Sequence, residues 1–151
     1  MLYLTILTVH SWVRWLVVIA GVAAFARAVS SGRRPWTRAD DRLGFWFVML
    51  LDLQFLIGLM LYAWLSPITH EAFRDIGAAM KNAGLRFWAV EHIFGMLIAL
   101  ALAHVCRARI RKADPYRRHR VAAIFFGLAL VAMFASIPWP GTPNARPLLR
   151  W

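Results

Sequence analysis

Cysteine is nearly absent from this chain of 151 residues, because Cys106 is the only one. A single cysteine excludes any disulfide within the chain. Cys106 stands near the end of an apolar stretch and directly before Arg107, which predicts a reduced, cytoplasmic setting for the thiol. Its ordinary interpretation is an inert residue of the core.

Acidic residues are also few, with seven Asp and Glu against eighteen Lys and Arg and a formal net charge of +11. The chain has no groove-reading or base-stacking module, which argues against nucleic acid as a partner. Twelve of the basic residues fall in segments 27–42 and 107–120. The positive-inside pattern and contacts with anionic lipid headgroups account for them there, so both segments are expected in the cytoplasm.

Motifs for substrate conversion are missing as well. We find no nucleophile beside a base, no closely spaced cluster of metal ligands and no phosphate-binding loop. Internal repeats and low-complexity segments are absent too. The sequence leaves open whether the protein is an enzyme.

Long apolar stretches dominate what remains, since 61% of the residues are hydrophobic. Four stretches approach the roughly 20 residues that an α-helix needs to cross a bilayer. They cover about 3–26, 43–64, 86–106 and 121–137. This pattern predicts an all-α fold in which residues 1–151 form one domain, a four-helix transmembrane bundle of the bacterial inner membrane.

The charge pattern also predicts orientation. Because the two basic segments follow the first and third spans, both termini and the loop 66–86 are expected outside. The first span lacks a preceding basic stretch and a clear cleavage pattern, so we expect it to remain in the mature protein. Ser66 and Pro67 form a helix-start pair, which predicts a short surface helix between the second and third spans. That helix either covers a site or rests on lipid.

Two histidines lie at matching depths in different spans. At about 1.5 Å per residue, His10 and His92 each lie about 10 Å inward from the outer start of their spans. Two imidazoles facing each other across a gap suit axial ligation of haem iron. Gly95, three residues after His92, would let a flat macrocycle or another backbone come close. The alternatives are hydrogen bonds from each histidine to a neighbouring helix, another metal, or a quinone.

Arg14 is a permanent charge inside the first apolar stretch and therefore needs a polar partner within the bundle. Asp52 falls at nearly the same depth and is the expected ion-pair partner. Glu91 competes for Arg14, or instead fixes the tautomer of the His10 ring, and a haem propionate is a further partner for Arg14. Asp52 and Gln54 lie about 200° apart around their helix, so they point into different seams. The Arg14–Asp52 pair is either architectural or part of a proton or redox path.

Four strings of residues resemble a known group of proteins. They are His10 to Trp15, Gln54 to Gly58 with Tyr62, Arg86 to His92 with Gly95 and Met96, and Ser136 to Pro140. Together they look like small bacterial four-helix membrane proteins labelled cytochrome b-like or uncharacterised, and the match covers nearly the whole chain. The resemblance implies that His10 and His92 hold haem. The chain departs from the diheme cytochromes in lacking two well-placed histidine pairs.

We therefore expect a membrane electron-transfer protein with one haem b near the outer face, held by His10 and His92. Arg14, Asp52 and Glu91 would tune the charge around it. One alternative is a non-catalytic accessory subunit that docks on a redox partner or other complex subunits through its proline-rich tail. The other is a proton or quinone pathway protein.

Overall fold

The computed structural model describes residues 1–32, 34–142 and 144–149, and this part of the chain is helical without strands. The elements, in chain order, are α1 (Leu2–Ser30), α2 (Arg38–Met60), η1 (Leu61–Leu65), α3 (Pro67–Arg74), α4 (Ile76–Lys81), α5 (Ala83–Arg86), η2 (Phe87–Glu91), α6 (His92–Lys112) and α7 (Arg118–Ser136). Here η1 and η2 are π-helical turns that continue α2 and precede α6. Four continuous helices, Leu2–Ser30, Arg38–Leu65, Ala83–Lys112 and Arg118–Ser136, are long and apolar enough to cross a membrane. The all-α expectation and the number of candidate spans are confirmed.

The helices extend beyond the apolar stretches at the basic end of the chain. α6 continues to Lys112, whereas the apolar stretch that predicts it ends near residue 106. Backbone hydrogen bonding does not depend on side-chain polarity, and cations stabilise the C-terminal turn of a helix. Arg109, Arg111 and Lys112 occupy that turn of α6.

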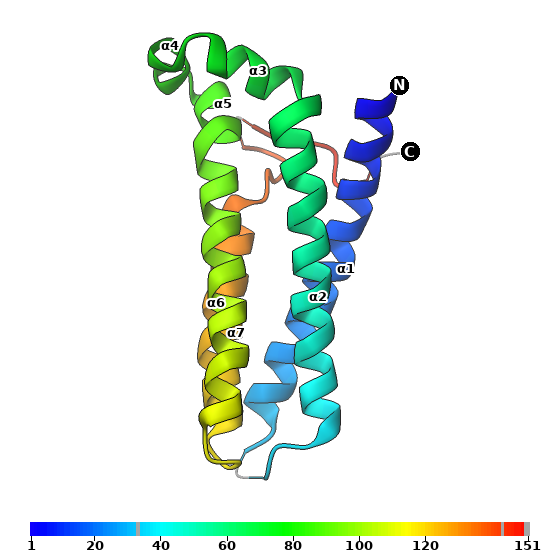
Figure 1. Cartoon of the computed structure of the whole chain (residues 1–151), viewed down its shortest axis with the longest axis vertical. Helices are drawn as coiled ribbons and strands as arrows, with labels where there is room; N and C mark the ends of the chain where they lie inside the picture. Colours follow the sequence, from blue (N-terminus) through cyan, green and yellow to red (C-terminus); the bar gives the residue numbers. More distant parts are fainter. Residues whose placement is uncertain (33, 143, 150–151) are drawn as a thin grey trace.

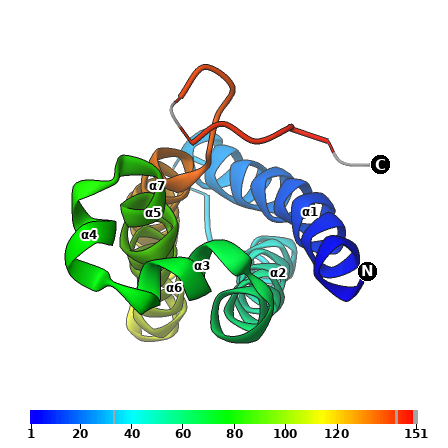
Figure 2. The same ribbon diagram turned by 90° about the horizontal axis from the view of Figure 1, so that it is seen from above.

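The four long helices form a ring in which α1 packs on α2 and α7, and α6 packs on α7 and α2 (Figures 1 and 2). The α1–α2 and α6–α7 connections, which carry the basic segments, lie together at one end (Figure 1). The N-terminus, the short helices α3 to α5 and tail residues 144–149 lie at the other. We call these the basic end and the tail end.

Aromatic rings and small residues make up the core. Phe47 of α2 and Phe126 of α7 meet edge to face with ring centroids 5.3 Å apart, and both are buried. A Cβ built on Gly21 would come within 2.7 Å of the Phe47 ring, so α1 needs glycine at this crossing. Small residues of this kind let helices approach closely in a membrane. Fully buried alanines serve α6 and α7 in the same way: Ala99, Ala103, Ala122 and Ala129.

Three short helices replace the single surface helix expected between the second and third spans. Each begins at a side chain that accepts a hydrogen bond from a backbone N–H three residues later: Ser66, Asp75 and Asn82. Such caps satisfy amide groups that the first turn leaves without partners. Pro67 occupies the first position of α3, as the Ser66–Pro67 pair predicts.

A buried carboxylate ties the α1–α2 connection together at the basic end. Asp40 accepts hydrogen bonds from Arg27 Nε at 2.6 Å and Arg34 Nη2 at 2.7 Å. Thr37 and Asp40 also form a reciprocal capping box at the start of α2. Close by, Arg107 of α6 pairs with the exposed Asp41 at 2.8 Å. These contacts fix the start of α2 against α1 and α6.

Candidate functional site

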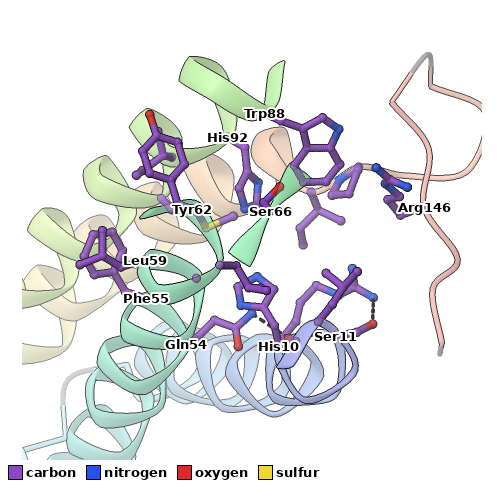
Figure 3. Close-up of a pocket in the computed structure, with 18 of the residues that line it drawn as sticks. His10, Ser11, Gln54, Phe55, Leu59, Tyr62, Ser66, Trp88, His92 and Arg146 are labelled. Atoms are coloured by element: carbon purple, nitrogen blue, oxygen red, sulfur yellow. Dashed lines mark hydrogen bonds between the residues drawn. The ribbon is translucent and has the colours of Figure 1, made fainter. Parts of the chain in front are cut away.

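A cavity of about 140 Å³ lies between the long helices in the half of the bundle nearer the tail end. Figure 3 shows its lining, to which α1, α2, η1, η2 and α6 all contribute side chains. Most of the lining is apolar. Its polar or charged residues are Tyr3, His10, Ser11, Arg14, Gln54, Tyr62, Ser66, Thr69, Trp88, His92 and Arg146.

His10 from α1 and His92 from α6 face each other across this cavity (Figure 3). Their ring centroids are 6.5 Å apart and their planes are inclined by 68°. A metal–imidazole bond of about 2 Å, with ring nitrogens about 1.2 Å from the ring centre, would separate two opposed ligand rings by about 6.4 Å. The observed separation suits one metal ion between the two rings.

The orientation of the His92 ring is fixed by α7. Its Nδ1 lies 2.8 Å from the carbonyl oxygen of Ser136. A carbonyl only accepts, so Nδ1 carries the hydrogen and Nε2 keeps a lone pair. Metal-binding histidines commonly donate their second N–H to a backbone carbonyl in this way. His92 is therefore arranged as a neutral donor to a ligand.

The His10 ring sits in a tighter setting formed with α2. Gln54 Nε2 donates to the backbone oxygen of His10 at 2.9 Å. Two buried atoms here, His10 Nδ1 and Gln54 Oε1, have no hydrogen-bond partner among the described residues. A Cβ on Gly58 would approach His10 Cε1 to 3.0 Å, so the glycine leaves room for the ring. Unsatisfied buried polar atoms are uncommon and mark places where a ligand or water completes the site.

Two π-helical turns frame the cavity toward the tail end. Leu61 and Tyr62 of η1 and Trp88 of η2 line it. The Tyr62 hydroxyl donates to the carbonyl oxygen of Ala89 at 2.7 Å and so joins the two turns. π-turns within α-helices are frequent at functional sites. The hydrophobic pattern of the sequence carries no signal for such a turn.

The C-terminal tail closes one side of the site (Figure 2). The carbonyl oxygen of Leu148 accepts hydrogen bonds from Arg14 Nη2 at 2.6 Å and from Trp15 Nε1 at 2.9 Å. Arg146 lies over the Trp88 ring, 5.2 Å from its centroid. Both arginines line the cavity, and its described lining contains no Asp or Glu. The site therefore has a cationic side that suits an anionic ligand group.

The predicted pairing of Arg14 with Asp52 is wrong, since Asp52 Oδ1 lies 2.8 Å from Nε2 of His104 instead. The reason is rotation around α2: Gln54 points toward α1, so Asp52, on the other side of the helix, points toward α6. The separation of Asp52 and Gln54 into different seams is confirmed.

Glu91 and Gly95 also differ from their expected roles. Glu91 forms an ion pair with Arg86 at 2.6 Å, where both side chains are about half exposed, and it reaches neither Arg14 nor His10. Gly95 lies against Ser136 of α7, because a Cβ there would collide with Ser136 Oγ. It permits close helix packing, and it is not among the residues that line the cavity.

The described residues contain no group of three or more His, Cys, Asp or Glu side chains that could together hold a metal ion. A metal bound by protein side chains alone, such as a structural zinc with four ligands, is therefore not indicated in this part of the chain. Sequence reasoning did not find Tyr62, Arg146 or the His104–Asp52 pair as contacts, because each depends on the relative rotation of helices or on the path of the tail. No protein-family model, curated protein or solved structure matches this chain.

Proposed function

We propose that this protein is a membrane electron carrier that binds one b-type haem between His10 and His92. The observation that carries the proposal is the pair of opposed imidazoles, 6.5 Å apart, in a largely apolar cavity between helices. Haem brings four equatorial nitrogens of its own, so it needs only two axial ligands from the protein. This requirement agrees with a site that offers two histidines and no larger cluster of ligands.

Each part of the site has a role in this proposal. The Ser136 carbonyl holds the His92 ring, and Gly58 leaves space for the His10 ring. Arg14 and Arg146 supply positive charge for the two carboxylates of the cofactor, with which arginine forms strong charge-assisted hydrogen bonds. A bound haem supplies a one-electron redox couple, and burial together with nearby cations sets its potential.

The size of the cavity adds a condition. Its volume of about 140 Å³ is below the roughly 300–1,000 Å³ typical of ligand pockets. Binding of a macrocycle therefore requires its walls to move outward. The tail and the α2–α6 seam are the parts able to yield, because the tail is held by few hydrogen bonds and α2 packs less extensively on α6 than on α1.

The orientation and location of the protein form part of the same proposal. The basic end would face the bacterial cytoplasm and the tail end the exterior, in accordance with the positive-inside pattern. The histidine pair would then lie in the outer half of the inner membrane, where a membrane redox partner on that side can exchange electrons with the cofactor.

The test is the absorption spectrum of protein purified after expression with ample haem. We expect a Soret band whose reduced spectrum is that of a six-coordinate, low-spin b-type haem. His10→Ala and His92→Ala should each remove that signature. His70→Ala, a change at an exposed position of α3, is the matched control and should retain it. A colourless protein, or histidine variants that keep the wild-type spectrum, would contradict the proposal.

The alternative of a proton or quinone path through Arg14, Asp52 and Glu91 loses its structural support. These residues contact Leu148, His104 and Arg86, respectively, and do not form one connected chain. The accessory-subunit alternative relied on a free tail. The described tail residues instead pack against α1 and η2 of their own chain.

A further inference from the structure

One ion pair lies along the apolar length of the bundle. Asp52 of α2 and His104 of α6 hydrogen-bond at 2.8 Å, and their side chains are 33% and 53% exposed. The other ion pairs among the described residues lie near the two ends. At about 1.5 Å per residue, Asp52 is about 13 Å from the start of its apolar stretch at residue 43, deep within the hydrocarbon layer.

Such exposure is unfavourable in lipid. Ionisable side chains inside membrane spans almost always face a bundle interior or a water-filled cavity, because hydrocarbon offers them no hydrogen bonds. Here the pair instead faces outward, on the side where α2 and α6 run next to each other (Figure 1). Exposed apolar side chains flank it on both helices: Met49, Leu53, Leu56, Leu97, Ala101 and Val105. Something other than lipid must cover this face.

We propose that a second copy of this chain covers the α2–α6 face and forms a two-fold symmetric dimer. The pair is self-complementary, since it contains one acidic acceptor and one imidazole with a second ring nitrogen. A two-fold axis beside the pair brings Asp52 of each copy toward the imidazole of the other, so both polar groups gain partners from one repeated contact. Hydrogen bonds between helices are an established contribution to helix association in membranes. This inference does not depend on haem binding.

The test is disulfide cross-linking of purified protein reconstituted in liposomes at low protein-to-lipid ratio. Ala101→Cys places a thiol on the proposed interface, one helical turn before His104. Val131→Cys, at an exposed position of α7, is the matched control on another face, and the native Cys106 is fully buried. We expect Ala101→Cys to give at least five-fold more dimer than Val131→Cys or the unsubstituted chain.

A second substitution tests the cause. Replacing both Asp52 and His104 by Leu in the Ala101→Cys chain should lower cross-linking at least five-fold, with the helical circular dichroism unchanged. Equal cross-linking from both cysteine positions, or cross-linking that persists after the double replacement, would overturn the proposal. Cross-linking confined to native membranes, with none in liposomes, would show that a different protein covers the face and would overturn it too.

Discussion

An alanine at Gly95 tests whether this glycine serves helix packing. Its Cβ would lie 3.0 Å from Ser136 Cβ and would collide with Ser136 Oγ. That hydroxyl is itself held by a hydrogen bond to the Ala132 carbonyl at 2.8 Å, so α6 and α7 must shift to admit the methyl group. Overpacking of this kind costs about 1–3 kcal/mol. We expect Gly95→Ala to lower the free energy of unfolding by about 2 kcal/mol.

A double-mutant cycle identifies the colliding atom. Ser136→Ala removes the hydroxyl and one hydrogen bond, for which we expect a cost of about 1 kcal/mol. In that background only the Cβ contact remains, so the cost of Gly95→Ala should fall by about 1 kcal/mol. The measurement is unfolding in mixed micelles with increasing denaturing detergent, followed by circular dichroism.

Two results would refute this reasoning. One is an equal cost of Gly95→Ala in both backgrounds, which would mean that the Ser136 hydroxyl is not the obstacle. The other is a Gly95→Ala protein with unchanged stability that no longer binds haem. That outcome would return Gly95 to the role that its position after His92 suggests, a close contact of the macrocycle.

Three further outcomes follow from the contacts described. Tyr62→Phe removes the hydrogen bond between η1 and η2 and should lower the unfolding free energy by about 1 kcal/mol in the same detergent titration; an unchanged midpoint would contradict this. Asp40→Asn should cost about 3 kcal/mol, because two arginines lose a buried partner, whereas Asp41→Asn at an exposed pair should cost less than about 1 kcal/mol. Equal effects would show that burial does not distinguish the pairs. Gly58→Ala crowds the His10 ring and should reduce the haem-to-protein ratio measured by absorption, with little change in circular dichroism; wild-type loading would refute the contact.

The long helices were predictable because their signal is local. Each needs only an apolar stretch of sufficient length, and the Ser66–Pro67 start of α3 depends on two adjacent residues. The depth of His10 and His92 could also be counted along separate helices. The structure places both rings at one cavity, as that count suggests.

The partners of charged residues were not predictable, because depth alone does not define them. Asp52 and Arg14 lie at similar depths, but the rotation of α2 turns Asp52 toward His104. Arg14 instead donates to Leu148, which is 134 residues away in the chain. Glu91 pairs with Arg86, only five residues earlier, and a charge partner that close removes the need for one deeper in the bundle.

The π-helical turns in the second and third long helices have a consequence for tolerance to deletions. Such a turn accommodates an extra residue, so the helical segments on its two sides are out of phase by about 100° relative to an uninterrupted α-helix. Deleting one residue from 61–65 would restore uniform winding but would swing the remainder of the helix, including the start of α3, around its axis. Length, rather than residue type, is then the most constrained property of these two segments.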